Sequence, residues 1–279
     1  MSLSTISTAL SKGEKTLKPI TNNYKYEAFW ILSDCLNMNH SDLLLNQCEI
    51  INQFQYQSFL KLINRRANKE PLQHILKSIF FYGYKFDPEK DVFIPRPETE
   101  VCIDIIKKHC RNTANVLEVG SGIGCIPIVL ELEKLAQNIL SIDINPDAIQ
   151  TSINNAKKLN CKNINFITGN FFNMAHTLKY DLIVSNPPYI PINQIHLLDT
   201  EVKFYDPLSA LTDYNDGMKF YKYFARFGKN LITDHGQILL EFGGSQQLEN
   251  LKVIFKNSDY QIDFFNDLNH EPRFMLLKL

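Results

Sequence analysis

The feature that most constrains the fold is an alternation, from residue 115 onward, of short apolar stretches with stretches whose apolar residues recur at helical spacing. Short buried strands that alternate with helices are typical of a parallel sheet with helices on both faces. The expected strands are residues 115–119, 138–144, 163–168 and 181–185, and the expected helices are residues 124–135 and 146–159. This pattern predicts a doubly wound α/β fold.

The last third of the chain continues the sheet. After residue 186 we expect a long irregular stretch. It is followed by a helix over 217–230, a strand over 237–242, a helix over 246–257, and strands over 262–265 and 274–279. Because the last two strands are close in sequence, they are expected to pair antiparallel. The whole is a mostly parallel, seven-stranded sheet.

The first part of the chain has a different pattern. Between residues 24 and 68, apolar residues such as Phe29, Leu32 and Leu36 recur at helical spacing, which predicts a small helical bundle. Residues 79–94 place aromatic and β-branched residues on both sides of the sequence Asp-Pro-Glu-Lys at 87–90, which is typical of a β-hairpin and its turn.

These patterns divide the chain into three parts. We expect an N-terminal helical domain over residues 1–76, a β-hairpin connector over 77–98, and an α/β domain over 99–279. At the start of the third part, Thr99 follows Pro97 and is expected to cap a helix that ends near Cys110.

Composition and charge exclude several classes of protein. With 29 basic and 30 acidic side chains the formal net charge is −1, without the basic excess of proteins held mainly by nucleic-acid phosphates. The six cysteines are scattered with no CxxC pair, so neither a zinc site nor a disulfide framework is expected. No apolar run approaches membrane-spanning length. We expect a cytoplasmic protein with no metal, no stable nucleic-acid complex and no membrane segment.

Three strand ends predict a nucleoside pocket. The first strand runs into a glycine-rich turn, where a backbone without Cβ atoms can approach a ligand. Its residues are Glu118, Val119, Gly120, Ser121, Gly122, Ile123 and Gly124. The second strand ends in Asp143, whose carboxylate can accept hydrogen bonds from both ribose hydroxyls. After the third strand, Asn170 can bond an adenine amine and Phe171 can contact its ring.

Each of these residues also has an ordinary structural interpretation. A glycine-rich sequence is found at many plain strand-to-helix turns, and a carboxylate at a strand end is commonly just solvated. Taken singly, Asn170 fits a turn residue and Phe171 a core residue better than ligand contacts. It is their combination at the carboxyl edge of one sheet that favours an adenosine site.

The fourth strand is followed by Asn186, Pro187, Pro188 and Tyr189. Two prolines fix φ at successive positions and remove two N–H donors, so this loop is expected to be rigid, with its acceptors held in place. A rigid loop that only shapes the surface is the alternative.

At this loop the chain resembles the release factor glutamine methyltransferases, known as PrmC or HemK, within the class I S-adenosylmethionine-dependent methyltransferases. The resemblance rests on three groups of residues: Arg65-Arg66 with Glu70-Pro71 and His74-Ile75; Ile94-Pro95-Arg96-Pro97-Glu98-Thr99-Glu100; and Val184-Ser185-Asn186-Pro187-Pro188-Tyr189-Ile190. Weaker marks are Asp206-Pro207-Leu208, Asp216-Gly217, Leu240-Glu241-Phe242-Gly243 and Arg273. The chain departs from the family at Glu118 and Asn170, where Asp is usual, at Phe171, where Trp is frequent, and at Phe80, where Glu is usual.

The resemblance implies a Rossmann-like methyltransferase fold and methyl transfer from S-adenosylmethionine to the glutamine amide of the Gly-Gly-Gln motif of release factors, with S-adenosylhomocysteine as product. It implies that the Asn186 side-chain oxygen and the Pro187 carbonyl accept the two hydrogens of the reacting amide, and that Tyr189 covers the amide face. The helical domain over residues 1–76 would help to bind the substrate protein, and its glutamine would contact Asn186, Pro187, Pro188 and Tyr189. The cofactor would contact Glu118, Gly120, Ser121, Gly122, Ile123, Gly124, Asp143, Asn170, Phe171 and Asn186. We expect a monomer.

Other functions share these residues. A sister family that methylates a ribosomal protein glutamine has the same loop, and DNA adenine methylation presents the same problem of an amine with two hydrogens. The near-neutral charge and the lack of a large insertion disfavour DNA, which needs a basic cleft and a pocket for a flipped base. A docking protein without turnover is a further alternative, which Asn186 and Tyr189 disfavour.

Overall fold

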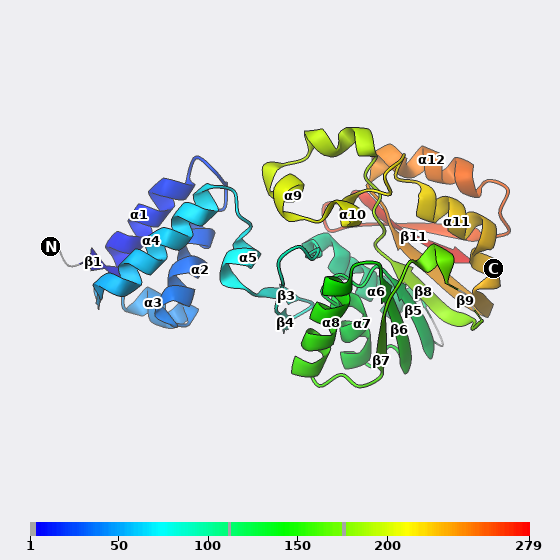
Figure 1. Ribbon diagram of the computed structural model, residues 1–279, viewed down its shortest axis with the longest axis horizontal. Helices are drawn as coiled ribbons and strands as arrows, with labels where there is room; N and C mark the ends of the chain where they lie inside the picture. Colours follow the sequence, from blue (N-terminus) through cyan, green and yellow to red (C-terminus); the bar gives the residue numbers. More distant parts are fainter. Residues whose placement is uncertain (1–3, 111–112, 175–176) are drawn as a thin grey trace. The chain divides into compact units, whose positions relative to one another are not determined.

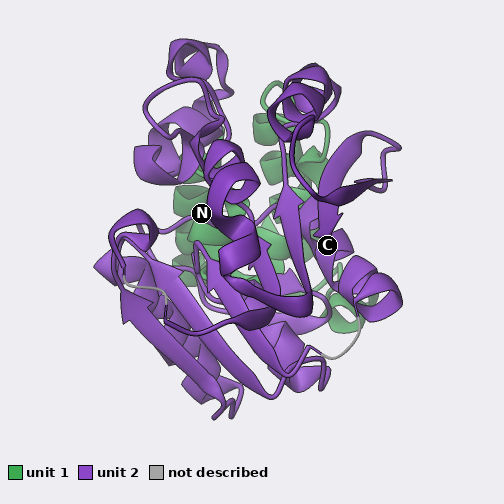
Figure 2. Cartoon of the chain, turned by 90° about the vertical axis from the view of Figure 1, so that its right-hand side faces the viewer, with its two compact units in different colours: residues 1–79 green, residues 80–279 purple. Residues whose placement is uncertain are grey.

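The computed structural model describes residues 4–110, 113–174 and 177–279, in two compact units. The first ends at Ile79 and the second begins at Phe80 (Figure 2). Within these described ranges, no helix is both long and apolar enough to cross a membrane.

The first unit is a helical bundle. Its elements are β1 (Ser4–Thr5), α1 (Ile6–Leu17), α2 (Tyr24–Leu36), α3 (His40–Leu45), β2 (Ile50–Ile51), α4 (Gln53–Ala67) and α5 (Leu72–Leu76). Helix α1 lies ahead of the region in which the sequence predicted helices. It packs closely against α4, because a Cβ at Gly13 would lie 2.7 Å from the Phe59 ring. Helix α4 begins with a capping box between Asn52 and Gln55.

A buried ion pair joins α2 and α4 in this unit. Arg66 Nε lies 2.5 Å from Glu27 Oε2, and their side chains are 4% and 9% exposed. The neighbouring Arg65 pairs with Glu70 through Nε and Nη2, at 2.7 and 2.5 Å. Two of the residues that carried the family resemblance therefore hold the end of α4 in place.

The expected hairpin exists, but its predicted turn is wrong. Strands β3 (Ile79–Phe81) and β4 (Tyr84–Phe86) are joined at Tyr82 and Gly83, whose φ angles are 52° and 82°. Two positive φ values are typical of the tight turn whose twist matches paired strands. The sequence at 87–90, which contains a proline, follows the hairpin instead.

The seven-stranded, mostly parallel sheet is confirmed. Its strands lie in the order β10-β11-β9-β8-β5-β6-β7 (Figure 1). The bounds are β5 (Asn115–Val119), β6 (Asn138–Asp143), β7 (Ile164–Thr168), β8 (Tyr180–Ser185), β9 (Ile232–Glu241), β10 (Gln261–Asn266) and β11 (Pro272–Lys278). Only β11 runs against its neighbours β9 and β10, so the antiparallel finish is also confirmed.

Helices cover both faces of the sheet. Helices α6 (Val101–His109), α7 (Cys125–Leu132) and α8 (Pro146–Lys158) pack on one side, and α11 (Lys219–Phe227) and α12 (Ser245–Phe255) on the other (Figure 1). Because side chains alternate along a strand, Leu117 and Val119 of β5 face Tyr221 and Phe224 of α11, while Glu118 points the opposite way.

The stretch after Asn186, expected to be irregular, contains short helices. They are η3 (Ile192–Leu197), α9 (Thr200–Tyr205) and α10 (Leu208–Leu211). Proline begins two of them, since Pro191 and Pro207 are the cap residues of η3 and α10. Pieces this short give little periodic signal, which is why the sequence did not reveal them.

Candidate active site

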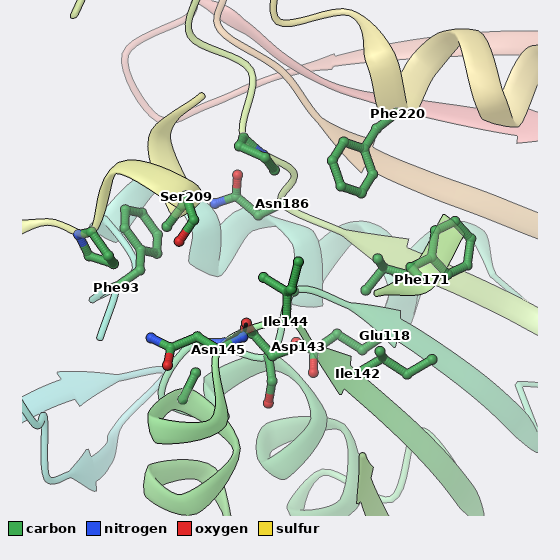
Figure 3. Close-up of a pocket in the computed structure, with 18 of the residues that line it drawn as sticks. Phe93, Glu118, Ile142, Asp143, Ile144, Asn145, Phe171, Asn186, Ser209 and Phe220 are labelled. Atoms are coloured by element: carbon green, nitrogen blue, oxygen red, sulfur yellow. Dashed lines mark hydrogen bonds between the residues drawn. The ribbon is translucent and has the colours of Figure 1, made fainter. Parts of the chain in front are cut away.

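A pocket of about 240 Å³ opens at the carboxyl ends of the central parallel strands. Strand order reverses between β5 and β8, and Val119 at the end of β5 is the register partner of Ser185 at the end of β8. Such a reversal point is where open α/β sheets bind ligands. Figure 3 shows Glu118 and Asp143 on one side of this pocket and Asn186 opposite them.

The glycine-rich turn after β5 requires its glycines. Gly120, Gly122 and Gly124 have φ angles of 93°, 55° and 84°, values that residues with a Cβ rarely adopt. A Cβ at Gly122 would also lie 3.2 Å from the carbonyl oxygen of Phe93. Gly120 and Gly122 line the pocket, together with Ser121 and Ile123, whereas Gly124 lies outside the pocket wall.

Asp143 at the end of β6 organises this turn. Its Oδ2 accepts from the backbone N–H of Gly122 at 2.9 Å and its Oδ1 from that of Asn145 at 2.8 Å. Burial raises the pKa of Asp143, and the backbone donors partly oppose that effect. The donors that lower the pKa are the backbone N–H groups of Asn145, Gly122, Ile144 and Ser121, and Asp143 also lines the pocket.

Glu118 is 1% exposed and lies on the pocket wall. Its Oε2 accepts from Ser141 Oγ at 2.5 Å. Burial raises the pKa of Glu118 well above its ordinary value, against the effect of the serine hydrogen bond. The Glu118 side chain, longer than the Asp that the resembled family usually has at this position, thus has a hydrogen-bond partner on β6.

Asn170 and Phe171 follow β7 as expected and line the pocket. Asn170 Oδ1 accepts from the backbone N–H of Phe172 at 3.1 Å and so caps the short helix η2 (Phe171–Asn173). Phe171 is 4% exposed and packs against Tyr223 and Phe224. Both residues therefore have the ordinary structural role as well as a place in the pocket wall.

Asn186 after β8 is tied to two other segments. Its Nδ2 donates to Thr99 Oγ1 at 3.3 Å, and Thr99 Oγ1 donates to Glu241 Oε2 at 2.9 Å. Thr99 lies in η1 (Pro97–Glu100) and Glu241 ends β9. The expected helix cap at Thr99 is wrong, because η1 and α6 begin without a side-chain cap and the hydroxyl bonds Glu241 instead.

The other residues of this loop differ in whether they face the pocket or the protein interior. Asn186 and Pro188 line the pocket, whereas Pro187 is buried and the Tyr189 hydroxyl donates to Glu241 Oε1 at 3.5 Å. The Tyr189 carbonyl accepts from Gln247 Nε2 at 2.7 Å. A Cβ at Gly217 would lie 2.1 Å from that carbonyl oxygen, so only glycine fits there.

Further residues of the pocket wall were not predicted as site residues. Arg96, one of the residues that carried the family resemblance, forms an ion pair with Asp206. The segments on either side of this pair contribute to the wall through Phe93, Pro95, Pro207, Ser209 and Ala210. Ile144, Tyr214, Lys219 and Phe220 also line the pocket. They lie in loops and helix starts, where no periodic pattern points to them.

Comparisons with known proteins agree with this geometry. Residues 8–76 match the PrmC N-terminal domain family, and residues 111–259 match a methyltransferase domain family. A release factor glutamine methyltransferase of Fusobacterium nucleatum is 34% identical over 253 residues, which cover 89% of this chain and 72% of the relative. One from Thermodesulfovibrio yellowstonii is 30% identical, covering 94% and 96%.

A solved structure shares the fold. The crystal structure of a methyltransferase from Pyrococcus furiosus superposes with a TM-score of 0.51 at 14% identity, over 69% of this chain and 88% of that one.

Proposed function

This chain belongs to the family of release factor glutamine methyltransferases, and from that premise we propose its reaction. It transfers the methyl group of S-adenosylmethionine to the side-chain amide nitrogen of the glutamine in the Gly-Gly-Gln motif of peptide chain release factors. The observation that carries the proposal is that Asn186 and the glycine-rich turn line one pocket.

The pocket residues fit the cofactor. Asp143 lines the pocket at the end of β6, where its carboxylate suits the ribose hydroxyls. Asn170 suits the adenine amine, and Phe171 the adenine ring. Glu118, Gly120, Ser121, Gly122 and Ile123 border the same space. When bound, S-adenosylmethionine supplies an electrophilic methyl group on a positively charged sulfur.

The reaction requires a glutamine amide nitrogen to act as the nucleophile that attacks the methyl group. That nitrogen is a weak nucleophile because its lone pair is delocalised into the carbonyl. In the proposed mechanism the Asn186 Oδ1 and the Pro187 carbonyl accept its two hydrogens, which favours the pyramidal geometry of the attacking state. Tyr189 covers the amide face, and after methyl transfer the displaced amide proton is released to solvent.

The N-terminal unit is the proposed binding element for the release factor, because residues 8–76 match the N-terminal domain of this family. The proposal includes a monomer in the cytoplasm. The scattered cysteines and the balanced charge support that location and the absence of nucleic acid from the complex.

The test is methyl transfer from labelled S-adenosylmethionine to a release factor, a ribosomal protein and duplex DNA in parallel, with mass spectrometry to locate the methyl group. We expect label on the Gly-Gly-Gln glutamine, with Asn186→Ala lowering kcat by about 100-fold or more. Label confined to the ribosomal protein or to DNA would overturn the proposed substrate.

A further inference from the structure

We propose that Thr99 and Glu241 are positioning residues that fix which way the Asn186 side-chain amide is turned. This inference rests on the proposed function, in which the Asn186 oxygen must face the substrate amide. An Asn amide turned the other way would present its NH₂ group to another NH₂ group, so the orientation decides whether the loop works.

The single hydrogen of the Thr99 hydroxyl decides which atom of the Asn186 amide faces it. A threonine has one hydroxyl hydrogen and two lone pairs. An ionised carboxylate accepts only, so the contact of 2.9 Å between Thr99 Oγ1 and Glu241 Oε2 uses that single hydrogen. Only lone pairs remain towards Asn186, and the atom that lies 3.3 Å from Thr99 must therefore be the amide nitrogen. The Asn186 oxygen is left free of this contact.

Burial leaves these hydrogen bonds without water as an alternative partner. Thr99 is 1% exposed and Glu241 4% exposed, so a misdirected hydrogen bond has no water to replace it. The three residues come from η1, the loop after β8 and the end of β9. Thr99 lies 87 residues from Asn186, and Glu241 lies 142 residues from Thr99. Segments far apart in the sequence therefore set the orientation of one catalytic side chain.

The charge of Glu241 decides the direction of the Thr99 hydrogen. The ionisable groups around it are Tyr189 in the catalytic loop, Glu98 in η1, Cys102 in α6, Tyr221 in α11 and Arg273 in β11. Burial raises the pKa of Glu241 to about 7, while Thr99, Arg273 and Tyr189 lower it and Glu98 raises it further. Burial also raises the pKa of Tyr189, which keeps its hydroxyl a donor.

Protonation would release the orientation. A protonated Glu241 can donate to Thr99, whose own hydrogen is then free to point at Asn186 and favour the reversed amide. The ionised state holds the working orientation, so activity should rise as the pH increases through about 7.

The test compares Thr99→Val, which keeps the shape and removes the hydroxyl, with Thr99→Ser, which keeps the hydroxyl. Thr151→Val is the matched control: Thr151 is 3% exposed, and its hydroxyl bonds the helix backbone at Asp147. We expect Thr99→Val to lower kcat on release factor about tenfold, as for one lost hydrogen bond, with KM and cofactor affinity unchanged. Thr99→Ser should stay within about twofold, and Thr151→Val should leave kcat unchanged.

A second readout does not need turnover. The NMR signals of the Asn186 side-chain NH₂ group should shift as the pH crosses about 7 in the wild type and stay constant in Thr99→Val. A kcat in Thr99→Val equal to that of Thr151→Val, or NH₂ signals that do not respond to pH in the wild type, would overturn the inference. A wild-type chain that leaves release factor unmethylated would instead overturn the proposed function, and the NMR result would still decide the orientation.

Discussion

Arg96 and Asp206 form an ion pair of 2.5 Å between residues 110 positions apart in the sequence. The Asp206 side chain is 4% exposed and that of Arg96 is 43% exposed. Burial raises the pKa of Asp206 to about 6, and the guanidinium partly opposes this. The pair fastens the segment that carries Pro95 to the segment that carries Pro207, two parts of the pocket wall.

Replacing Asp206 by Asn should therefore weaken the binding of S-adenosylmethionine. We expect the Kd to rise about three- to tenfold, the range for loss of a partly buried charged hydrogen bond. In the wild type, affinity should also fall as the pH drops through about 6, because the protonated carboxyl loses its ion pair. Isothermal titration calorimetry at several pH values measures both effects. Asp259→Asn removes an exposed pair with Lys229 and serves as control; equal Kd values for the two variants would contradict this role.

Asp143→Asn should have a larger effect on cofactor binding. The substitution puts an NH₂ group where the carboxylate accepts from the backbone N–H of Gly122 or Asn145. One donor then faces another, and the turn loses its support. We expect the Kd for S-adenosylmethionine to rise about tenfold or more. Asp147→Asn, at an exposed position in the first turn of α8, is the matched control. Unchanged affinity in Asp143→Asn would rule out the ribose role.

The buried pair of Glu27 and Arg66 should matter for stability and leave the cofactor site intact. Glu27→Gln keeps the side-chain shape but removes the carboxylate that pairs with Arg66, whose side chain is 4% exposed. We expect a loss of about 3–5 kcal/mol in the free energy of unfolding of the N-terminal unit. Denaturant unfolding of the full chain measures this loss, and Glu249→Gln, which removes an exposed pair with Lys252, is the control. A loss no greater than that of the control would show that the pair is dispensable.

Glu241 should make stability depend on pH. Its pKa is raised from 4.5 to about 7 by burial, so the folded state holds this proton more tightly than the unfolded state. The contribution to stability is full below pH 4.5 and is lost as the pH rises through about 7. Glu241→Gln should consequently raise the melting temperature at pH 8 relative to the wild type. Thermal unfolding between pH 6 and 8 measures the difference; a variant that melts lower at pH 8 would contradict the prediction.

The central sheet was predictable because its signals are local. Strands such as Asn115–Val119 and helices such as Pro146–Lys158 carry their periodicity within a few residues. The hairpin turn was misplaced because Tyr82 adopts a positive φ that its residue type does not indicate, while the sequence around Pro88 resembles a turn.

The site was only partly predictable for a related reason. Gly120, Asp143 and Asn186 each follow a strand, so the parallel sheet brings them to one edge. Thr99 looked like a helix cap because its true partner, Glu241, lies 142 residues away. Contacts of this range, like that of Arg96 with Asp206, depend on how the whole α/β unit packs, and no spacing rule reports them.

Gly217 shows how a residue without a functional group can govern a catalytic loop. Its missing side chain leaves room for the Tyr189 carbonyl, to which a Cβ would come within 2.1 Å. In a survey of all single substitutions, every replacement at Gly217 should therefore impair activity by displacing the loop, as replacements at Asn186 do by removing an acceptor. In such a survey, loss of activity would then mark positions where the loop needs space as well as positions whose side chains take part in the chemistry.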